Sequence, residues 1–114
     1  MKHIHTSIAR GRLFKPLINT PSVQAAMMTL KPGQVSGEYG DEHPKAEQWL
    51  YVVSGSGVAI GTRSRIALRA GSLLLIRKNE AHQIKNTGRK AMVTMNFYAP
   101  PAYTSDGEVR KEVE

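Results

Sequence analysis

Residues 71–86 decide the fold of this chain, and they read GSLLLIRKNEAHQIKN. They hold two short apolar runs separated by the polar turn residues RKNE. Side chains alternate along an extended second run, so Gln83 and Lys85 share one face while His82 and Ile84 share the other. Because the first of these faces suits water, His82 is predicted to point into the protein.

Short apolar runs of the same kind recur along most of the chain, and each ends near glycine, proline or asparagine. Strands bounded by such turn residues at about ten-residue spacing favour an all-β sandwich or barrel. No eleven-residue window carries a helical stripe, so a helix has room only in the tail, 104–114, which we expect to be flexible. The runs predict strands at 25–30, 48–53, 58–60, 65–69, 73–76, 81–85 and 91–98.

A second segment, residues 37–55, reads GEYGDEHPKAEQWLYVVSG. The two segments together resemble the two motifs of the cupin superfamily, G(x)5HxH(x)3-4E(x)6G and G(x)5PxG(x)2H(x)3N. The second motif keeps its spacing throughout, with Arg77 in the proline place and Asn79 in the glycine place. Asparagine is a mild replacement, because it tolerates the left-handed conformation. The resemblance covers residues 37–86 directly. It implies one domain over residues 1–114, an antiparallel double-stranded β-helix of the jelly-roll or cupin-barrel kind.

The first motif departs from the family pattern in its histidines and its glutamate. Anchored on Gly55, the motif puts Gln48 in the glutamate place, His43 in the second histidine place and Asp41 in the first. Counted from the other end, His43 takes the first histidine place and Lys45 the second. One histidine is missing in either alignment, and an amide replaces the carboxylate.

The resemblance implies a divalent metal ion inside the barrel, with His43, Gln48 and His82 as its ligands and Glu47 or Asp41 as rivals for the third position. Two histidines and one carboxylate with open coordination positions are typical of non-haem iron chemistry, and here the third ligand is the Gln48 amide oxygen or a carboxylate of Asp41, Glu42 or Glu47. The ion would be iron, zinc, nickel or manganese. The alternative is a degenerate site without metal, in which both histidines are satisfied by hydrogen bonds.

Two functions remain open at this point, because the fold hosts both enzymes and binders. One is a metal-dependent enzyme of the dioxygenase or isomerase kind that acts on a small molecule. The other is a non-catalytic protein that binds a small ligand in the same pocket. The lost histidine and the lost glutamate favour the second.

The run 48–53 is apolar on both faces, and such a strand needs cover on both. If Gln48 points inward, Trp49, Tyr51 and Val53 form an apolar outer face, which predicts a homodimer. Exchange of the N-terminal strands would add to that contact.

Charge and composition limit the possible partners and the cellular location of the protein. The chain of 114 residues carries a net charge of +7 and no cysteine, which excludes disulfides and thiolate metal sites. Aromatic residues make up only 6%, too few for nucleic-acid stacking, so we expect no specific nucleic-acid partner. The longest apolar run, 49–53, is far shorter than a membrane span, and residues 1–14 show no secretory signal pattern, so a cytoplasmic location is expected. His3 and His5 alternate, and we expect them on one exposed face of an N-terminal strand.

Overall fold

The structure, a computed structural model, describes residues 1–37 and 45–108. All strand pairs within them are antiparallel, which confirms the all-β prediction. The predicted strands are found with bounds that agree to within two residues. The elements are a 3-10 helix η1 (Thr6–Ala9) and strands β1 (Phe14–Asn19), β2 (Gln24–Leu30), β3 (Glu47–Ser54), β4 (Ser56–Gly61), β5 (Arg65–Arg69), β6 (Leu73–Ile76), β7 (His82–Asn86) and β8 (Met92–Ala99).

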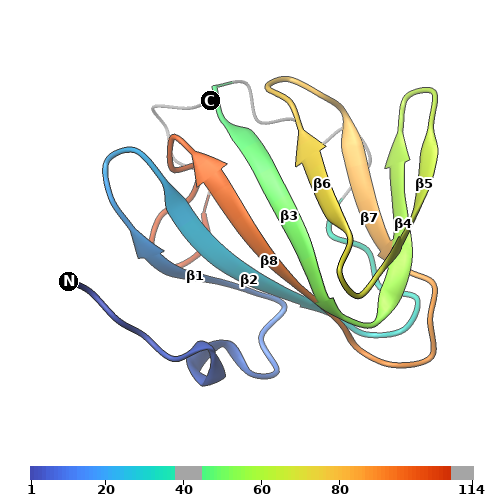
Figure 1. The fold of residues 1–114 in the computed structure, drawn as a ribbon, viewed down its shortest axis with the longest axis horizontal. Coiled ribbons are helices and arrows are strands. Elements are labelled where there is room, and N and C mark those ends of the chain that lie inside the picture. The colour runs from blue at the N-terminus through green and yellow to red at the C-terminus, as the bar shows by residue number, and fades with distance from the viewer. Residues whose placement is uncertain (38–44, 109–114) are drawn as a thin grey trace.

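Two sheets form the barrel, one of five strands in the order β1-β2-β8-β3-β6 and one of three in the order β5-β4-β7 (Figure 1). The core lies where their inner faces meet, because its buried side chains come from both sheets. Burial of this apolar surface is the main favourable term in folding. The core residues are Met28, Leu30, Leu50, Val52, Ala59, Leu68, Ile84 and Met92.

The alternation along β3 has the predicted phase. Gln48 and Leu50 are buried, with 4% and 0% of their surface exposed. Trp49 and Tyr51, on the opposite face, are 39% and 43% exposed. The inner face of the neighbouring strand β8 is partly polar, as Asn96 is fully buried there. The five-stranded sheet thus brings polar groups into the barrel interior.

The turn before β7 takes the conformation expected from the motif. Asn79 has a φ of +64°, in the left-handed region that favours glycine or asparagine. Glu80 closes the turn, as its Oε1 accepts a hydrogen bond from the backbone N of Arg77 at 2.9 Å. The turn delivers His82 to the first position of β7 with its side chain buried.

His3 and His5 are exposed, as expected, but the N-terminal strand predicted to carry them is not found among residues 1–13. His3 and His5 lie outside any strand, and His5 instead precedes η1, where its Nδ1 accepts a hydrogen bond from the backbone N of Ser7 at 3.1 Å. Strand β1 was not expected, because Pro16 cannot donate to a strand ladder. It is tolerated here because β1 is an edge strand whose register shifts between Pro16 and Ile18.

The expected flexible tail is in part an ordered turn. The backbone N of Thr104 donates to the carbonyl oxygen of Glu108 at 2.7 Å, and Gly107 N donates to Thr104 O at 3.0 Å. Residues 109–114 lie outside the described residues. In the described part of the chain, no helix has the length and apolar character to cross a membrane.

Candidate functional site

A cavity of about 180 Å³ lies inside the barrel, and two of the three predicted metal ligands line it. They are Gln48 from β3 in one sheet and His82 from β7 in the other. The third, His43, and its neighbour Asp41 lie outside the described residues. The remaining lining residues are Phe14, Met28, Ser36, Ile84, Tyr98, Tyr103 and Gly107.

His82 is 9% exposed, and its ring is oriented by the turn that precedes it. Its Nδ1 lies 2.9 Å from the carbonyl oxygen of Glu80. Because a carbonyl oxygen can only accept, Nδ1 donates this hydrogen bond, and in the neutral ring the lone pair is then on Nε2. This tautomer is the one that a metal-ligating histidine adopts when it binds through Nε2.

Gln48 begins a buried chain of side-chain hydrogen bonds. Its Nε2 donates to Oδ1 of Asn96 at 2.9 Å, and Nδ2 of Asn96 donates to Oγ1 of Thr94 at 3.0 Å. With Asn96 in this orientation, a flipped Gln48 amide would set two oxygens against each other. Within the described structure, Oε1 of Gln48 is buried and has no hydrogen-bond partner. A buried acceptor of this kind costs about 1–3 kcal/mol.

Glu47, the rival oxygen ligand, is on the other side of the sheet. Its Oε1 accepts a hydrogen bond from Nε1 of Trp49 at 3.2 Å on the outer face. Successive side chains of a strand point to opposite faces, so Glu47 and Gln48 cannot both face the cavity. Of these two candidates, the structure brings Gln48 to His82.

An aromatic group that sequence reasoning missed forms one wall of the cavity. The ring centroid of Tyr103 lies 4.7 Å from that of Phe14 and 5.0 Å from that of Tyr98. Buried Gln24 holds this wall in place, since its Oε1 accepts from the backbone N atoms of Ala102 and Tyr103 and its Nε2 donates to Tyr103 O at 2.8 Å. Nothing in the sequence indicated this role, because Gln24 lies outside both motif segments, 37–55 and 71–86.

Residues 33–36 run beside β7 and close another side of the cavity. Oγ of Ser36 accepts from the backbone N of Ile84 at 3.0 Å, and Ser36 N donates to Ile84 O at 2.8 Å. Nε2 of Gln83 donates to the carbonyl oxygen of Gly37 at 2.6 Å. The chain just before residues 38–44 is therefore fixed next to His82.

The described lining of the cavity is nearly neutral. It contains no lysine, arginine, aspartate or glutamate, so His82 is its one titratable group apart from two tyrosines. Across residues 1–37 and 45–108, no group of three or more His, Cys, Asp or Glu side chains could hold a metal ion. The described donors suited to a metal are Nε2 of His82 and Oε1 of Gln48.

The fold and the two motif segments agree with a family comparison. Residues 26–98 match the family model described as a cupin domain. The chain belongs to the cupin family. The match extends beyond the motif segments to β2 and β8, the strands that carry the inner wall of the site. No curated protein sequence matches this cupin.

Solved structures similar to this cupin share its fold at low sequence identity. A protein from Bacillus halodurans is 23% identical, with 92% of this chain and 83% of that chain covered and a TM-score of 0.80. An RmlC-like cupin from Desulfovibrio desulfuricans is 18% identical over 89% and 99%, with a TM-score of 0.73. KdgF from a Halomonas species is 19% identical over 77% of each chain, with a TM-score of 0.70. These similarities show the double-stranded β-helix fold.

Proposed function

We propose that this cupin binds a small polar molecule inside the barrel, together with a divalent metal ion held by His43, Gln48 and His82. The observation that carries the proposal is the unpartnered Oε1 of Gln48. A buried acceptor is stabilised when a hydrogen-bond donor or a cation reaches it. Nε2 of His82, in its acceptor tautomer, is a second electron-pair donor in the same cavity.

The donors fit a divalent ion, and they fit it weakly. Imidazole nitrogen suits iron, nickel and zinc, and an amide oxygen suits harder ions such as manganese. Without a carboxylate, the site lacks the anionic ligand that would offset the charge of the ion. Gln83 donates a hydrogen bond to the carbonyl oxygen of Gly37, and His43 follows Gly37 in the sequence. A bound ion would supply Lewis-acid or oxygen-activating chemistry, as dioxygenase-like or isomerase-like enzymes need.

The cavity also limits the class of small molecule. Its volume of about 180 Å³ is below the roughly 300–1,000 Å³ of sites for drug-sized ligands. The described lining offers acceptors at Gln48 and His82, an aromatic wall, and no lysine or arginine for an anion. These features favour a hydroxylated, uncharged molecule of a few heavy atoms, or the hydroxylated end of a longer one.

A second candidate is a non-catalytic binder that uses the same acceptors without metal. It is favoured by the absence, within the described residues, of any three-residue group of metal-ligating type. In this function, hydroxyl groups of the ligand donate to Oε1 of Gln48 and Nε2 of His82 directly.

Metal uptake tests the proposal. Untagged protein is soaked in iron(II), zinc, nickel or manganese, desalted, and its metal content is measured by mass spectrometry. We expect partial occupancy in the native protein and a loss on the order of tenfold or more for His82→Ala. Gln48→Glu should raise occupancy, because it adds the missing negative charge.

His5→Ala is the matched control, since it removes an exposed histidine that lies outside the barrel. Its metal content should equal that of the native protein. If native protein takes up none of the four ions, the metal-dependent function is wrong. The binder is then tested by thermal shift with small polyols. A stabilisation that His82→Ala removes supports it, and no stabilisation by any of them refutes it.

A further inference from the structure

We propose that the outer face of the five-stranded sheet is the interface of a symmetric dimer of this chain. The proposal stands apart from the cavity, because it concerns the opposite side of the sheet. Most of the exposed large hydrophobic side chains of the described structure lie on this one face. Those on its strands or on the turn into β2 are Val23, Trp49, Tyr51, Val53, Leu73 and Phe97.

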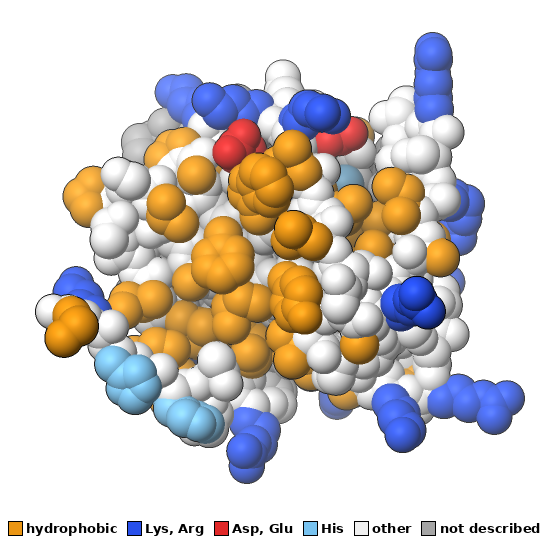
Figure 2. Space-filling view, in the orientation of Figure 1, with side chains coloured by type: hydrophobic (Ala, Val, Ile, Leu, Met, Phe, Trp, Pro, Cys, Tyr) orange, Lys and Arg blue, Asp and Glu red, His pale blue; other side chains and the backbone are white. Residues whose placement is uncertain are grey.

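The strand register makes these side chains one continuous surface. Trp49 of β3 is paired with Phe97 of β8 on one side and with Leu75 of β6 on the other. Tyr51 is likewise paired with Met95 and Leu73. Figure 2 shows the hydrophobic side chains gathered over these strands, with lysines and arginines around the margin. A contiguous apolar patch of this extent marks an interaction site.

The size of the face suits a dimer. Five strands about 4.8 Å apart and up to eight residues long span about 20 by 25 Å, or roughly 500 Å² before side-chain relief is counted. Chance contacts bury less than about 400 Å² per partner, and a standard interface buries about 800 Å². Two flat sheet faces also pack well against each other, as in β-sandwiches.

The charges on the face favour a second copy over an anionic partner. Across β2, β8, β3 and β6, the outward positions carry one charged side chain, Glu47, at the start of its strand, and the edge strand β1 adds Lys15. A two-fold contact sets the residues near its axis against their own copies, so a centre without charge is required. Nucleic acid or an anionic membrane would need lysine and arginine on the face itself. The two charged side chains, Glu47 and Lys15, thus stand at the start of a strand and on the edge strand, and the centre of the face is uncharged.

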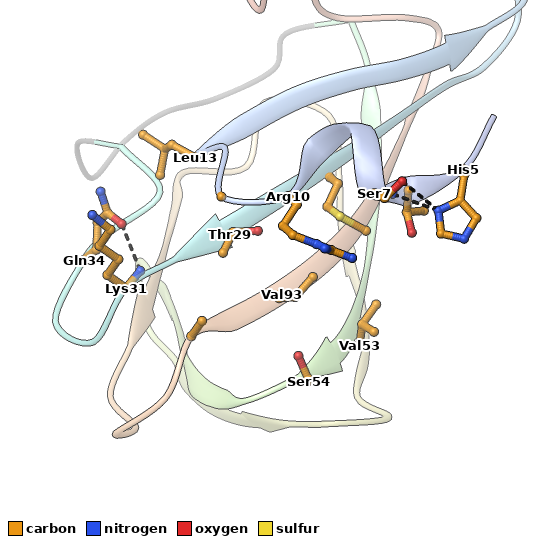
Figure 3. Close-up of a pocket in the computed structure, with 14 residues that line it drawn as sticks. His5, Ser7, Arg10, Leu13, Thr29, Lys31, Gln34, Val53, Ser54 and Val93 are labelled. Carbon is orange, nitrogen blue, oxygen red and sulfur yellow. Dashed lines mark hydrogen bonds between the residues drawn. The ribbon is translucent and has the colours of Figure 1, made fainter.

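A hollow of about 670 Å³ adjoins the face and gives it relief. Its floor includes Val53 and Val93, which belong to the face, and Arg10 of the N-terminal segment lies over it (Figure 3). A second hollow of about 550 Å³ includes Val23 and Phe97. Both hollows continue the same apolar surface. A second copy that covers the face would therefore also fill the hollows with its side chains.

Light scattering and sedimentation test the dimer. Native protein at about 100 μM should have twice the 12.6 kDa mass of the chain. Tyr51→Glu sets like charges against each other at the interface, and it should raise the dissociation constant by about a thousandfold or more. Ile66→Glu is the matched control, since Ile66 is 46% exposed, like Tyr51 at 43%, but lies on β5 of the other sheet. It should remain a dimer.

Leu73→Glu guards against a folding defect in Tyr51→Glu, because Leu73 is 65% exposed and lies next to Tyr51. Both variants should keep the native circular dichroism and sediment at half the native mass. The proposal is overturned if the native protein is a monomer at this concentration, or if Ile66→Glu dissociates it equally. It is also overturned if the monomer pellets with anionic vesicles or binds duplex DNA in a way that Tyr51→Glu abolishes.

Discussion

The two faces of β3 present different chemistry from side chains one residue apart. The inner face sets the amide of Gln48 into a closed, hydrogen-bonded cavity of about 180 Å³. The outer face sets the rings of Trp49 and Tyr51 on a broad apolar surface. An enclosed polar atom selects a partner by direction and distance, whereas an open apolar surface selects by shape and area. One strand thereby presents an enclosed polar group on one face and an open apolar surface on the other.

Truncating one leucine on each face of the five-stranded sheet should show the difference between the two faces most clearly. Leu50 is fully buried in the core, so Leu50→Ala should lower the free energy of unfolding by about 2–5 kcal/mol. Leu73 is 65% exposed, so Leu73→Ala should change it by about 0.5 kcal/mol or less in the monomer. Urea unfolding on a Tyr51→Glu background measures both without a contribution from association. Equal losses would mean that Leu73 is packed within its own chain and that the contrast is wrong.

The buried polar chain should give the next largest effect. Asn96→Ala leaves Nε2 of Gln48 without an acceptor, which should cost about 1–3 kcal/mol in addition to the lost packing. The double variant Gln48→Met with Asn96→Leu removes both partners and nearly keeps their shape, so it should be more stable than Asn96→Ala. Metal or ligand binding should be lost in the double variant all the same. Chemical unfolding and the metal assay together measure the two effects.

If the double variant is instead less stable than the single one, the Gln48–Asn96 pair stabilises the fold beyond satisfying its own atoms. If it still binds metal, Oε1 of Gln48 takes no part in the site. Thr94→Val serves as a control, because it removes only the far end of the chain and leaves the bond between Gln48 and Asn96 in place.

Much of the fold was predictable because strand alternation and turn residues are local signals. The runs 65–69 and 73–76 predicted the bounds of β5 and β6, and the motif predicted the left-handed turn at Asn79. Strand β1 escaped because Pro16 reads as a break, and only its edge position, a tertiary fact, makes the proline acceptable. Helix η1 escaped because four residues are too few for a helical stripe.

Two side chains of the cavity were predicted from the sequence, and the residues that hold them in place were not. Spacing and phase pointed to His82 and Gln48, and both line one cavity. The hydrogen bond between Gln48 and Asn96 links residues 48 positions apart. Gln24 holds the aromatic wall across 79 positions. Such contacts depend on how the strands are ordered in the sheet, and no local pattern encodes that order.

The smallest effect expected concerns the turn that closes the cavity near Gly107. Oγ1 of Thr104 donates to Oδ1 of Asp106 at 2.6 Å, and this hydrogen bond is the main cause that lowers the pKa of Asp106 from its ordinary value of 3.8. A lowered pKa in the folded state stabilises the turn above pH 3.8, and this contribution is lost as the pH falls through the lowered value. Thr104→Val should return the titration midpoint of the Asp106 carboxyl towards 3.8, as measured by carbon NMR. Asp106 is fully exposed, so the melting temperature at neutral pH should hardly change, in contrast to Leu50→Ala. An unchanged midpoint in Thr104→Val would show that the hydroxyl of Thr104 does not bind the Asp106 carboxylate in solution.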